Sequence, residues 1–191
     1  MPIELTITLS DEDLQRFQDS IDKGEQLLDN SVPTADIEEA AAELIGKAQS
    51  LQLPEFIAER LLKLQVLLNM VQDSEWQLTT AECRSIHSVL YYFIEPNDVI
   101  PDDIPGIGYL DDALYAELVC QQLSHEIKSY QEFCEFRKAE ESRRKASGLD
   151  THVGREDWIA SKRAQLHARM RERRTLSKGG RGFRMRLLES A

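Results

Sequence analysis

The sequence predicts an all-α protein: a helical bundle with a Pro/Gly-rich central turn and a basic C-terminal helix that leads into a flexible tail. Three observations favour this fold class. Strong helix formers (Leu, Ala, Gln, Glu and Arg) dominate the composition. Apolar residues recur with helical spacing along most of the chain. Three of the six prolines fall within one segment of 22 residues, 91–112, so the remainder of the chain is largely free of helix breakers.

Two helices are expected near the N-terminus. Ser10 is suited to cap a helix over about 11–28, because serine side chains accept hydrogen bonds from the first turn and the next three residues are acidic. Pro33 and Thr34 open a second helix. Its apolar side chains share one face: Ile37, Ala41, Leu44, Ile45 and Ala48.

Two further helices precede the proline-rich segment. Pro54 stands where a third helix begins, since proline fits the first helical turn. Thr79 and Glu82 have the spacing of a capping box that starts a fourth helix, and Pro96 ends it. The apolar positions expected in the third helix are Phe56, Ile57, Leu61, Leu64, Leu67, Leu68 and Val71.

The C-terminal half is expected to hold two long helices. One runs from Asp111 to roughly Arg144 and stops before Gly148. A last helix covers about 155–176, and the glycine-rich tail that follows is expected to be mobile. We therefore divide the chain into an acidic helical body, residues 1–147, and a basic C-terminal arm, residues 148–191.

Residues 3–9 alternate apolar and polar side chains, which is the pattern of a short β-strand. No second strand is predicted, and a lone strand leaves backbone groups unpaired. Three arrangements remain open. The strand pairs with its copy in a homodimer, it adds to the edge of a partner's sheet, or the segment lies extended over the helices.

The net charge of −11 conceals a strong asymmetry. Residues 1–135 carry 27 acidic and 7 basic side chains, a net charge of −20. Residues 136–191 carry 7 acidic and 16 basic side chains, a net charge of +9. Such a division concerns the partners of a protein rather than its fold, because it sets the electrostatic field that each region presents.

Cysteine usage predicts a cytoplasmic protein without disulfides. If Cys120 and Cys134 share one helix, about 21 Å separates them, too far for a disulfide bond. Cys83 leaves an odd number of thiols, and small buried residues are their expected role. The N-terminus lacks the basic start and long apolar core of a signal peptide. No transmembrane segment is expected, since the uncharged run Ser85–Ile94 has ten residues where about 20 are needed.

The segment 91–112 carries the most specific motif of the chain. Its prolines and glycines are Pro96, Pro101, Pro105, Gly106 and Gly108. The prolines prevent a helix and restrict the preceding residues, while the glycines permit backbone conformations that other residues avoid. Together they predict one defined turn between two helices.

This segment closely resembles the signature of the YkvA-like family, Pro-x-Asp-x-Ile-Pro-Asp-x-Ile-Pro followed by Gly-x-Leu-Asp-Asp. The matching positions are Pro96, Asp98, Ile100, Pro101, Asp102, Ile104, Pro105, Gly108, Leu110, Asp111 and Asp112. The flanking segments 73–76 and 130–137 also resemble bacterial members with a longer helical body. The resemblance implies a small helical fold in the bacterial cytosol, and it implies no reaction.

Four aspartates of the motif have two readings. Asp98 and Asp102 are suited to accept backbone hydrogen bonds within the turns, and Asp111 or Asp112 to cap the next helix. Alternatively the four carboxylates converge on a divalent cation such as Mg²⁺, Ca²⁺ or Mn²⁺, in a metal-binding module or a metal-dependent enzyme.

The remaining candidate chemistry is sparse. Cys83 and His87 share a helix face, yet two ligands do not make a zinc site, and a nucleophilic pair would lack an orienting group. No phosphate-binding glycine loop is present, because Gly106 and Gly108 lack the third glycine and the preceding strand.

The basic arm holds the candidate binding residues. Ten cations fall within 25 residues, opposed only by Glu172: Lys162, Arg163, Arg169, Arg171, Arg173, Arg174, Lys178, Arg181, Arg184 and Arg186. Residues 179–184 are similar to a fragment of arginine–glycine-rich RNA-binding segments.

Three partners fit this charge. The arm binds nucleic acid through phosphate contacts, it docks on an acidic protein or an anionic membrane surface, or it folds over the acidic body of its own chain or of a dimer mate. The sequence thus predicts a non-enzymatic interaction or adaptor module that engages an anionic partner. The metal-dependent module centred on the aspartates is the alternative.

Overall fold

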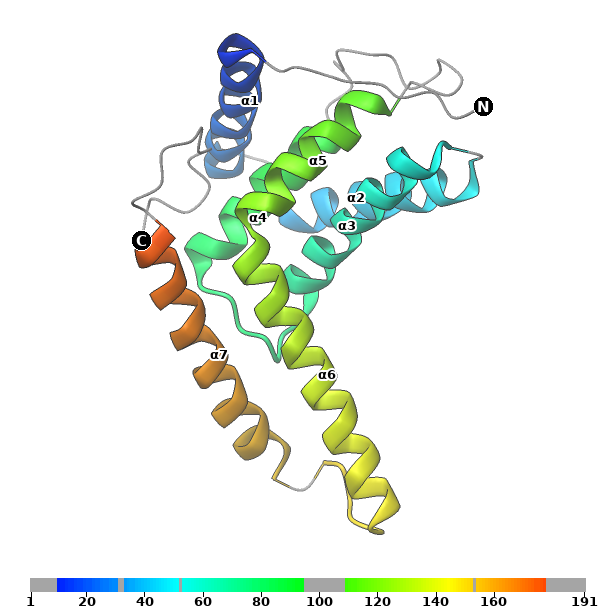
Figure 1. The fold of residues 1–191 in the computed structure, drawn as a ribbon, viewed down its shortest axis with the longest axis vertical. Coiled ribbons are helices and arrows are strands. Elements are labelled where there is room, and N and C mark those ends of the chain that lie inside the picture. Colours follow the sequence, from blue (N-terminus) through cyan, green and yellow to red (C-terminus); the bar gives the residue numbers. More distant parts are fainter. Residues whose placement is uncertain (1–9, 31–32, 52, 95–108, 153, 178–191) are drawn as a thin grey trace.

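The computed structural model describes residues 10–30, 33–51, 53–94, 109–152 and 154–177, which form helices and no strand, so the all-α prediction is confirmed (Figure 1). The predicted strand at residues 3–9 lies outside these residues. In chain order the helices are α1 (Asp11–Asn30), α2 (Thr34–Ser50), α3 (Glu55–Gln72), α4 (Thr80–Ile94), α5 (Leu110–Gln122), α6 (Ser124–Ala146) and α7 (Arg155–Ser177).

The helix starts follow the local signals in the sequence. Pro33 and Pro54 occupy the positions immediately before α2 and α3 with an extended ψ, as expected of proline at a helix entrance. The capping box at α4 forms: the backbone N–H of Thr79 donates to Glu82 Oε2 at 2.9 Å, and the N–H of Glu82 donates to Thr79 Oγ1 at 3.3 Å. These four residues mark where three helices, α2, α3 and α4, begin.

One predicted helix is divided in two. The expected long helix from Asp111 breaks at Leu123, whose φ of −87° and ψ of 17° lie outside the α-helical range. The hydrogen bonds of Leu123 N–H to Val119 O and of Ile127 N–H to Leu123 O persist across the break, so α5 and α6 are joined by a bend rather than by a loop.

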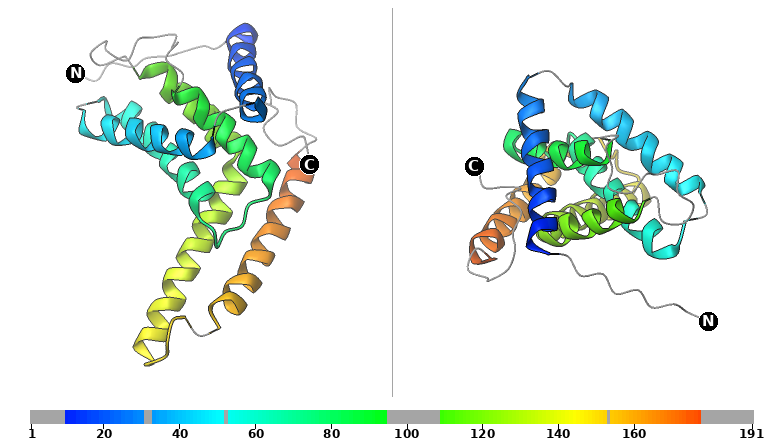
Figure 2. Two further views of the ribbon diagram at one scale, coloured as in Figure 1. Left: turned by 180° about the vertical axis from the view of Figure 1, so that it is seen from behind. Right: turned by 90° about the horizontal axis from the view of Figure 1, so that it is seen from above.

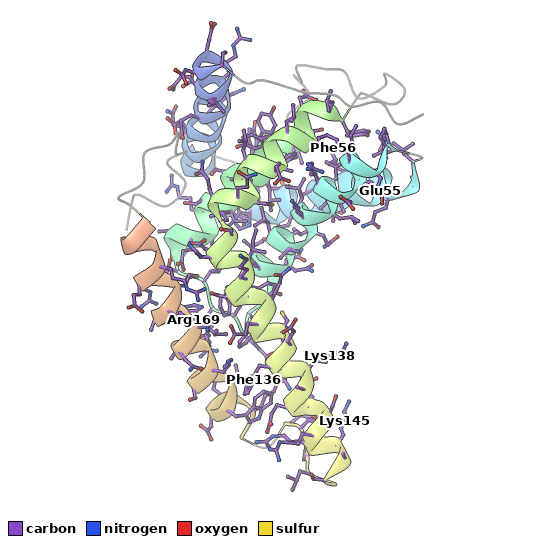
Figure 3. All side chains as sticks on the ribbon, viewed as in Figure 1. Glu55, Phe56, Phe136, Lys138, Lys145 and Arg169 are labelled. Atoms are coloured by element: carbon purple, nitrogen blue, oxygen red, sulfur yellow. The ribbon has the colours of Figure 1, made fainter. Side chains whose placement is uncertain are left out.

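The central helix α3 packs against α2, α4, α5 and α6, and α1 covers the outer side of α4. Fully buried side chains on α3, including Leu64, Leu67 and Met70, occupy the middle of the core. Phe56 departs from the predicted apolar stripe: it is 39% exposed at the start of α3 (Figure 3). The guanidinium of Arg60 covers its ring, 3.9 Å from the centroid.

Helices α6 and α7 form an antiparallel hairpin whose lower half projects from the other helices (Figure 1). Gly148, with a φ of +68°, follows α6, and Gly154, with a φ of +63°, precedes α7, so both ends of the connection use glycine where other residues are strained. The loop between α3 and α4, residues 73–79, runs between α6 and α7, as the view from behind also shows (Figure 2). Within the described helices, none combines the length and the apolar character required to cross a membrane.

Two helical glycines provide a matched test of the α1–α4 contact. Adding a Cβ at Gly24 would place it 3.0 Å from the backbone oxygen of Ser88 on α4, so Gly24→Ala must displace α1. A Cβ at Gly46 meets nothing within 4 Å. We expect Gly46→Ala to raise the free energy of unfolding by roughly 0.5–1 kcal/mol through helix propensity, and Gly24→Ala to lower it despite the same propensity gain. Urea denaturation of both variants measures the difference, and equal stabilisation would contradict the close α1–α4 approach.

Candidate functional site

The basic C-terminal helix is docked on the rest of the chain by an apolar side. Ile159, Leu166 and Met170 of α7 are completely buried. Their spacing of seven and four residues places them on one face of the helix. The opposite face, which includes Ser161, Ala164, Gln165 and Ala168, is exposed. Helix α7 is therefore an integral layer of the fold.

Glu132 of α6 binds two cations of α7. Lys162 Nζ lies 2.9 Å from Glu132 Oε1, and a guanidinium nitrogen of Arg169 contacts Glu132 Oε2. Arg169 is labelled on α7 in Figure 3. The hydrogen bonds from Lys162 and then from Arg169 hold the pKa of Glu132 below its ordinary value, because they stabilise the ionised carboxylate. Two of the predicted binding cations are thus engaged within the chain.

Glu75, in the α3–α4 loop, joins this loop to both helices of the hairpin. Arg155 at the start of α7 donates from Nε to Glu75 Oε1 at 2.5 Å, and Arg137 of α6 lies 2.8 Å from Oε2. Arg163 of α7 donates to the backbone oxygen of Glu75 at 2.8 Å. The hydrogen bond from Arg155 is the largest of the effects that keep the pKa of Glu75 below its ordinary value, and burial opposes it.

Asp73 adds a second anchor on α6. Its carboxylate lies 2.7 Å from a guanidinium nitrogen of Arg137 and accepts a hydrogen bond from the hydroxyl of Tyr130 at 3.2 Å. Arg137 therefore bridges two carboxylates of one short loop. Charge-assisted and paired hydrogen bonds of this kind fix geometry as well as contributing energy.

Trp76 is the centre of this arrangement and is completely buried. Its ring centroid lies 5.6 Å from that of Tyr130 and 5.1 Å from that of Phe133, both on α6. The imidazole of His167 on α7 packs edge-on against it at 4.4 Å. The next residue, Gln77, has a φ of +54°, the sole positive φ of a non-glycine residue within the described part of the chain.

Aromatic–cation contacts hold the far end of the hairpin. The guanidinium groups of Arg144 on α6 and Arg155 on α7 lie 5.3 and 5.4 Å from the ring centroid of Trp158. Lys162 lies 5.5 Å from the ring centroid of Phe136. Each such contact is worth about 0.5–1 kcal/mol at exposed sites. The positive charges of Arg144, Arg155 and Lys162 are thus engaged by aromatic rings of the same chain, which the sequence alone does not reveal.

The ten predicted cations consequently fall into three groups. Lys162, Arg163 and Arg169 are paired with acidic or backbone groups of the same chain. Arg171 is exposed and Arg173 is partly exposed, and neither forms an ion pair with a described residue. The side chain of Arg174 and the residues Lys178, Arg181, Arg184 and Arg186 lie outside the described part of the structure.

Exposed cations also occur on α6, which the sequence reasoning did not single out. Lys138 and Lys145 project from the side of α6 that faces away from α7 (Figure 3). They follow Lys128 along the same helix face, and that face also holds Glu135. Three lysines with an intervening acid form an ordinary solvated surface.

The structure leaves the aspartate hypothesis open. Asp111 and Asp112 lie in the first turn of α5, where the helix dipole favours negative charge, and they are 6% and 2% exposed. Asp98 and Asp102 lie outside the described residues. Within those that are described, no group of three or more His, Cys, Asp or Glu side chains is placed to hold a metal ion.

Cys83 and His87 do not act as a pair. His87 Nδ1 donates to the backbone oxygen of Cys83 at 2.8 Å, and Nε2 lies 2.8 Å from Glu38 Oε1 on α2. Both ring nitrogens are therefore occupied, Nδ1 within α4 and Nε2 in joining α4 to α2. The Cys83 thiol has a raised pKa, chiefly because of burial, which opposes thiolate formation. Burial also raises the pKa of Cys120 to about 12, and all three cysteines are free thiols.

The sequence reasoning missed the residues that dock α7. The ion pair of Glu75 with Arg155 joins residues 80 positions apart, and the contact of Trp76 with His167 joins residues still further apart. No periodicity reports such pairings. A signal was nevertheless present, since the segment with Glu75 and Trp76 and the segment from Tyr130 to Arg137 were the two flanks that resembled relatives with a longer body.

The comparison with protein families matches residues 85–116 to a family described as a protein of unknown function (DUF1232). The matched segment holds most of α4 and half of α5, including buried Val89, Leu90, Phe93 and Tyr115. Tyr115 packs on Tyr92 with centroids 3.9 Å apart. A comparison with curated proteins found no match, and neither did one with solved structures. The similarity therefore concerns the α4–α5 core and excludes the docked arm.

The depressed pKa of Glu75 predicts an acid-sensitive attachment of the hairpin. Since Glu75 is ionised more easily when folded, its contribution to stability is present above its unfolded pKa of about 4.5 and is lost as the pH falls through the lower folded value. We expect Glu75→Gln to lower the free energy of unfolding at pH 7 and to reduce its loss between pH 5 and pH 3. Urea denaturation at several pH values measures both effects. Glu43→Gln, at an exposed position of α2, is the control, and an unchanged acid dependence in Glu75→Gln would contradict the role of this carboxylate.

Proposed function

We propose that this protein is a non-enzymatic interaction module whose basic C-terminal region engages an anionic partner, with nucleic acid as the first candidate. The observation that supports it is that the cations of the arm fall into two sets, one paired within the chain and one beyond the paired positions. Four cations from Arg155 to Arg169 pair with the chain itself, so α7 is held in a fixed position. Arg171 and Arg173 follow at the end of the docked part, beyond the paired cations, where basic residues continue in the sequence.

This division assigns different roles to residues of the same charge. The inner cations orient α7, and the terminal cations from Arg171 to Arg186 are presented to the partner. Phosphate contacts from arginine and lysine position a protein on nucleic acid without reading its sequence. Because the first 135 residues carry a net charge of −20, they repel a polyanion, so binding is confined to the C-terminal end of the chain.

The segment 91–112 and the free cysteines bear on the family and the cellular compartment of the protein. We infer that the segment 91–112 makes the protein a YkvA-like relative, since this segment overlaps the matched residues 85–116. We place the protein in the bacterial cytoplasm, in keeping with its free cysteines. An acidic protein or an anionic membrane surface is the outcome that remains if nucleic acid does not bind.

Fluorescence anisotropy with labelled single- and double-stranded oligonucleotides tests this proposal on the full chain. The proposal predicts salt-sensitive binding, with a log–log salt slope of about −4.5 on the duplex if about five cations meet phosphates. We expect joint replacement of the arginines at 171, 173, 181, 184 and 186 by glutamine to abolish it. Cutting the chain at Gly148 is unsuitable, because the buried side of α7 would be lost with it.

The charge-matched control replaces three exposed lysines of α6, Lys128, Lys138 and Lys145, by glutamine and is compared with a variant that loses the three arginines at 181, 184 and 186. The proposal predicts that this control retains most of the affinity although it also loses positive charge. Equal loss in both variants would show that only net charge matters. A salt slope near zero, or no binding at low salt, would exclude nucleic acid as the partner.

A further inference from the structure

His167 is buried, packs against Trp76 and has one ring nitrogen without a hydrogen-bond partner among the described residues. It is 6% exposed, and its ring packs edge-on against Trp76 at 4.4 Å. Its Nε2 has no hydrogen-bond partner among the described residues. A backbone hydrogen bond with Trp76 therefore occupies the other ring nitrogen. The neutral ring fits this site, because its unprotonated nitrogen needs no acceptor.

The charges around His167 come from α4 and from α7 itself. Glu82 of α4 favours the imidazolium, as does the backbone bond to Trp76, whereas Arg171 and Arg163 of α7 disfavour it. The neighbouring α6 contributes the rings of Tyr130 and Phe133 around Trp76. Burial is the largest single effect, and it lowers the pKa of His167 from its ordinary value of 6.5. Protonation would create a second N–H donor in a buried site without an acceptor and would add a third positive charge beside two guanidinium groups.

We propose that His167 is a pH-dependent switch, in which protonation of the imidazole releases α7 from the α3–α4 loop. The geometry supports release of α7 in particular. His167 lies at the contact between α7 and Trp76, and the loop also holds α7 through Arg155 and Arg163. The switch concerns the docking of α7 and does not depend on the identity of any partner.

The direction of the effect follows from linkage. Released α7 exposes His167 and gives it an ordinary pKa, so the released state binds a proton more readily than the docked state. The docked state is fully favoured above about pH 6.5 and loses stability as the pH falls from there through the lower docked value. The ratio of docked to released α7 falls about tenfold for each unit by which docking lowers the pKa.

The titration of His167 can be measured separately from the titration of Glu75 and Glu132 at the same interface. The pKa values of Glu75 and Glu132 lie below their ordinary value of 4.5, so both carboxylates stay ionised while His167 titrates. A change between pH 7 and pH 5 therefore reports the histidine, whereas a change below pH 4.5 reports the ion pairs. The two windows allow each contribution to be measured alone.

Two measurements on the full chain test the switch. In the first, NMR follows the His167 ring from pH 8 to pH 4.5, with the resonance assigned in the wild type through its contact with the Trp76 ring. In the second, a Trp158→Phe background leaves Trp76 as the sole tryptophan. We expect the Trp76 emission to shift to longer wavelength between pH 7 and pH 5 as the ring becomes exposed, and we expect His167→Gln to remove this shift.

His152→Gln is the matched control, because His152 is exposed in the connection before α7 and its loss should leave the Trp76 shift intact. A shift that persists in His167→Gln would overturn the proposal. If that variant does not fold, the NMR titration still decides: a His167 that titrates at or above 6.5, or one that titrates while Trp76 stays buried, would overturn it as well.

Discussion

The insertion of Trp76 between α6 and α7 is the contact on which the C-terminal half depends. A loop of seven residues carries a completely buried indole into the hairpin and presents Asp73 and Glu75 to arginines of both helices. The capping box at Thr79 and Glu82 then ends the loop at a fixed point. The apolar contact supplies most of the driving force, since burying an aromatic side chain removes a large area from water. The partly exposed ion pairs mainly fix the orientation of α7.

This arrangement changes the meaning of the charge asymmetry. Many of the cations in residues 136–169 are neutralised within the protein by Asp73, Glu75, Glu132, Glu140 and Glu141. The acidic body and the basic arm are thus partners of one another before any external ligand is considered. An anionic partner must therefore be recognised by cations that are not paired with acidic residues of the same chain.

The sequence predicts local features of this fold well. Proline, threonine and glutamate at helix entrances predict the starts of α2, α3 and α4, because caps and proline act within one turn. The break at Leu123 escaped prediction, since it has neither proline nor glycine and its hydrogen bonds continue. The pairing of Glu75 with Arg155 escaped it too, because contacts across 80 residues depend on how helices pack. The sequence shows that the ten cations cluster near the C-terminus. It does not show that Lys162, Arg163 and Arg169 pair within the chain, because that depends on the rotation of α7 about its axis, which a thin apolar stripe does not reveal.

The most direct test of this account is hydrogen exchange of the backbone amides in the wild type and in Trp76→Ala at pH 7. The account predicts that the amides of α7 lose protection selectively, while those of α2, α3 and α4 keep most of theirs, because α7 is docked through this indole. Trp158→Ala, at the far end of the hairpin, should leave most of α7 protected. Wild-type protection of α7 in Trp76→Ala, or an equal loss in every helix, would contradict the central role assigned to Trp76.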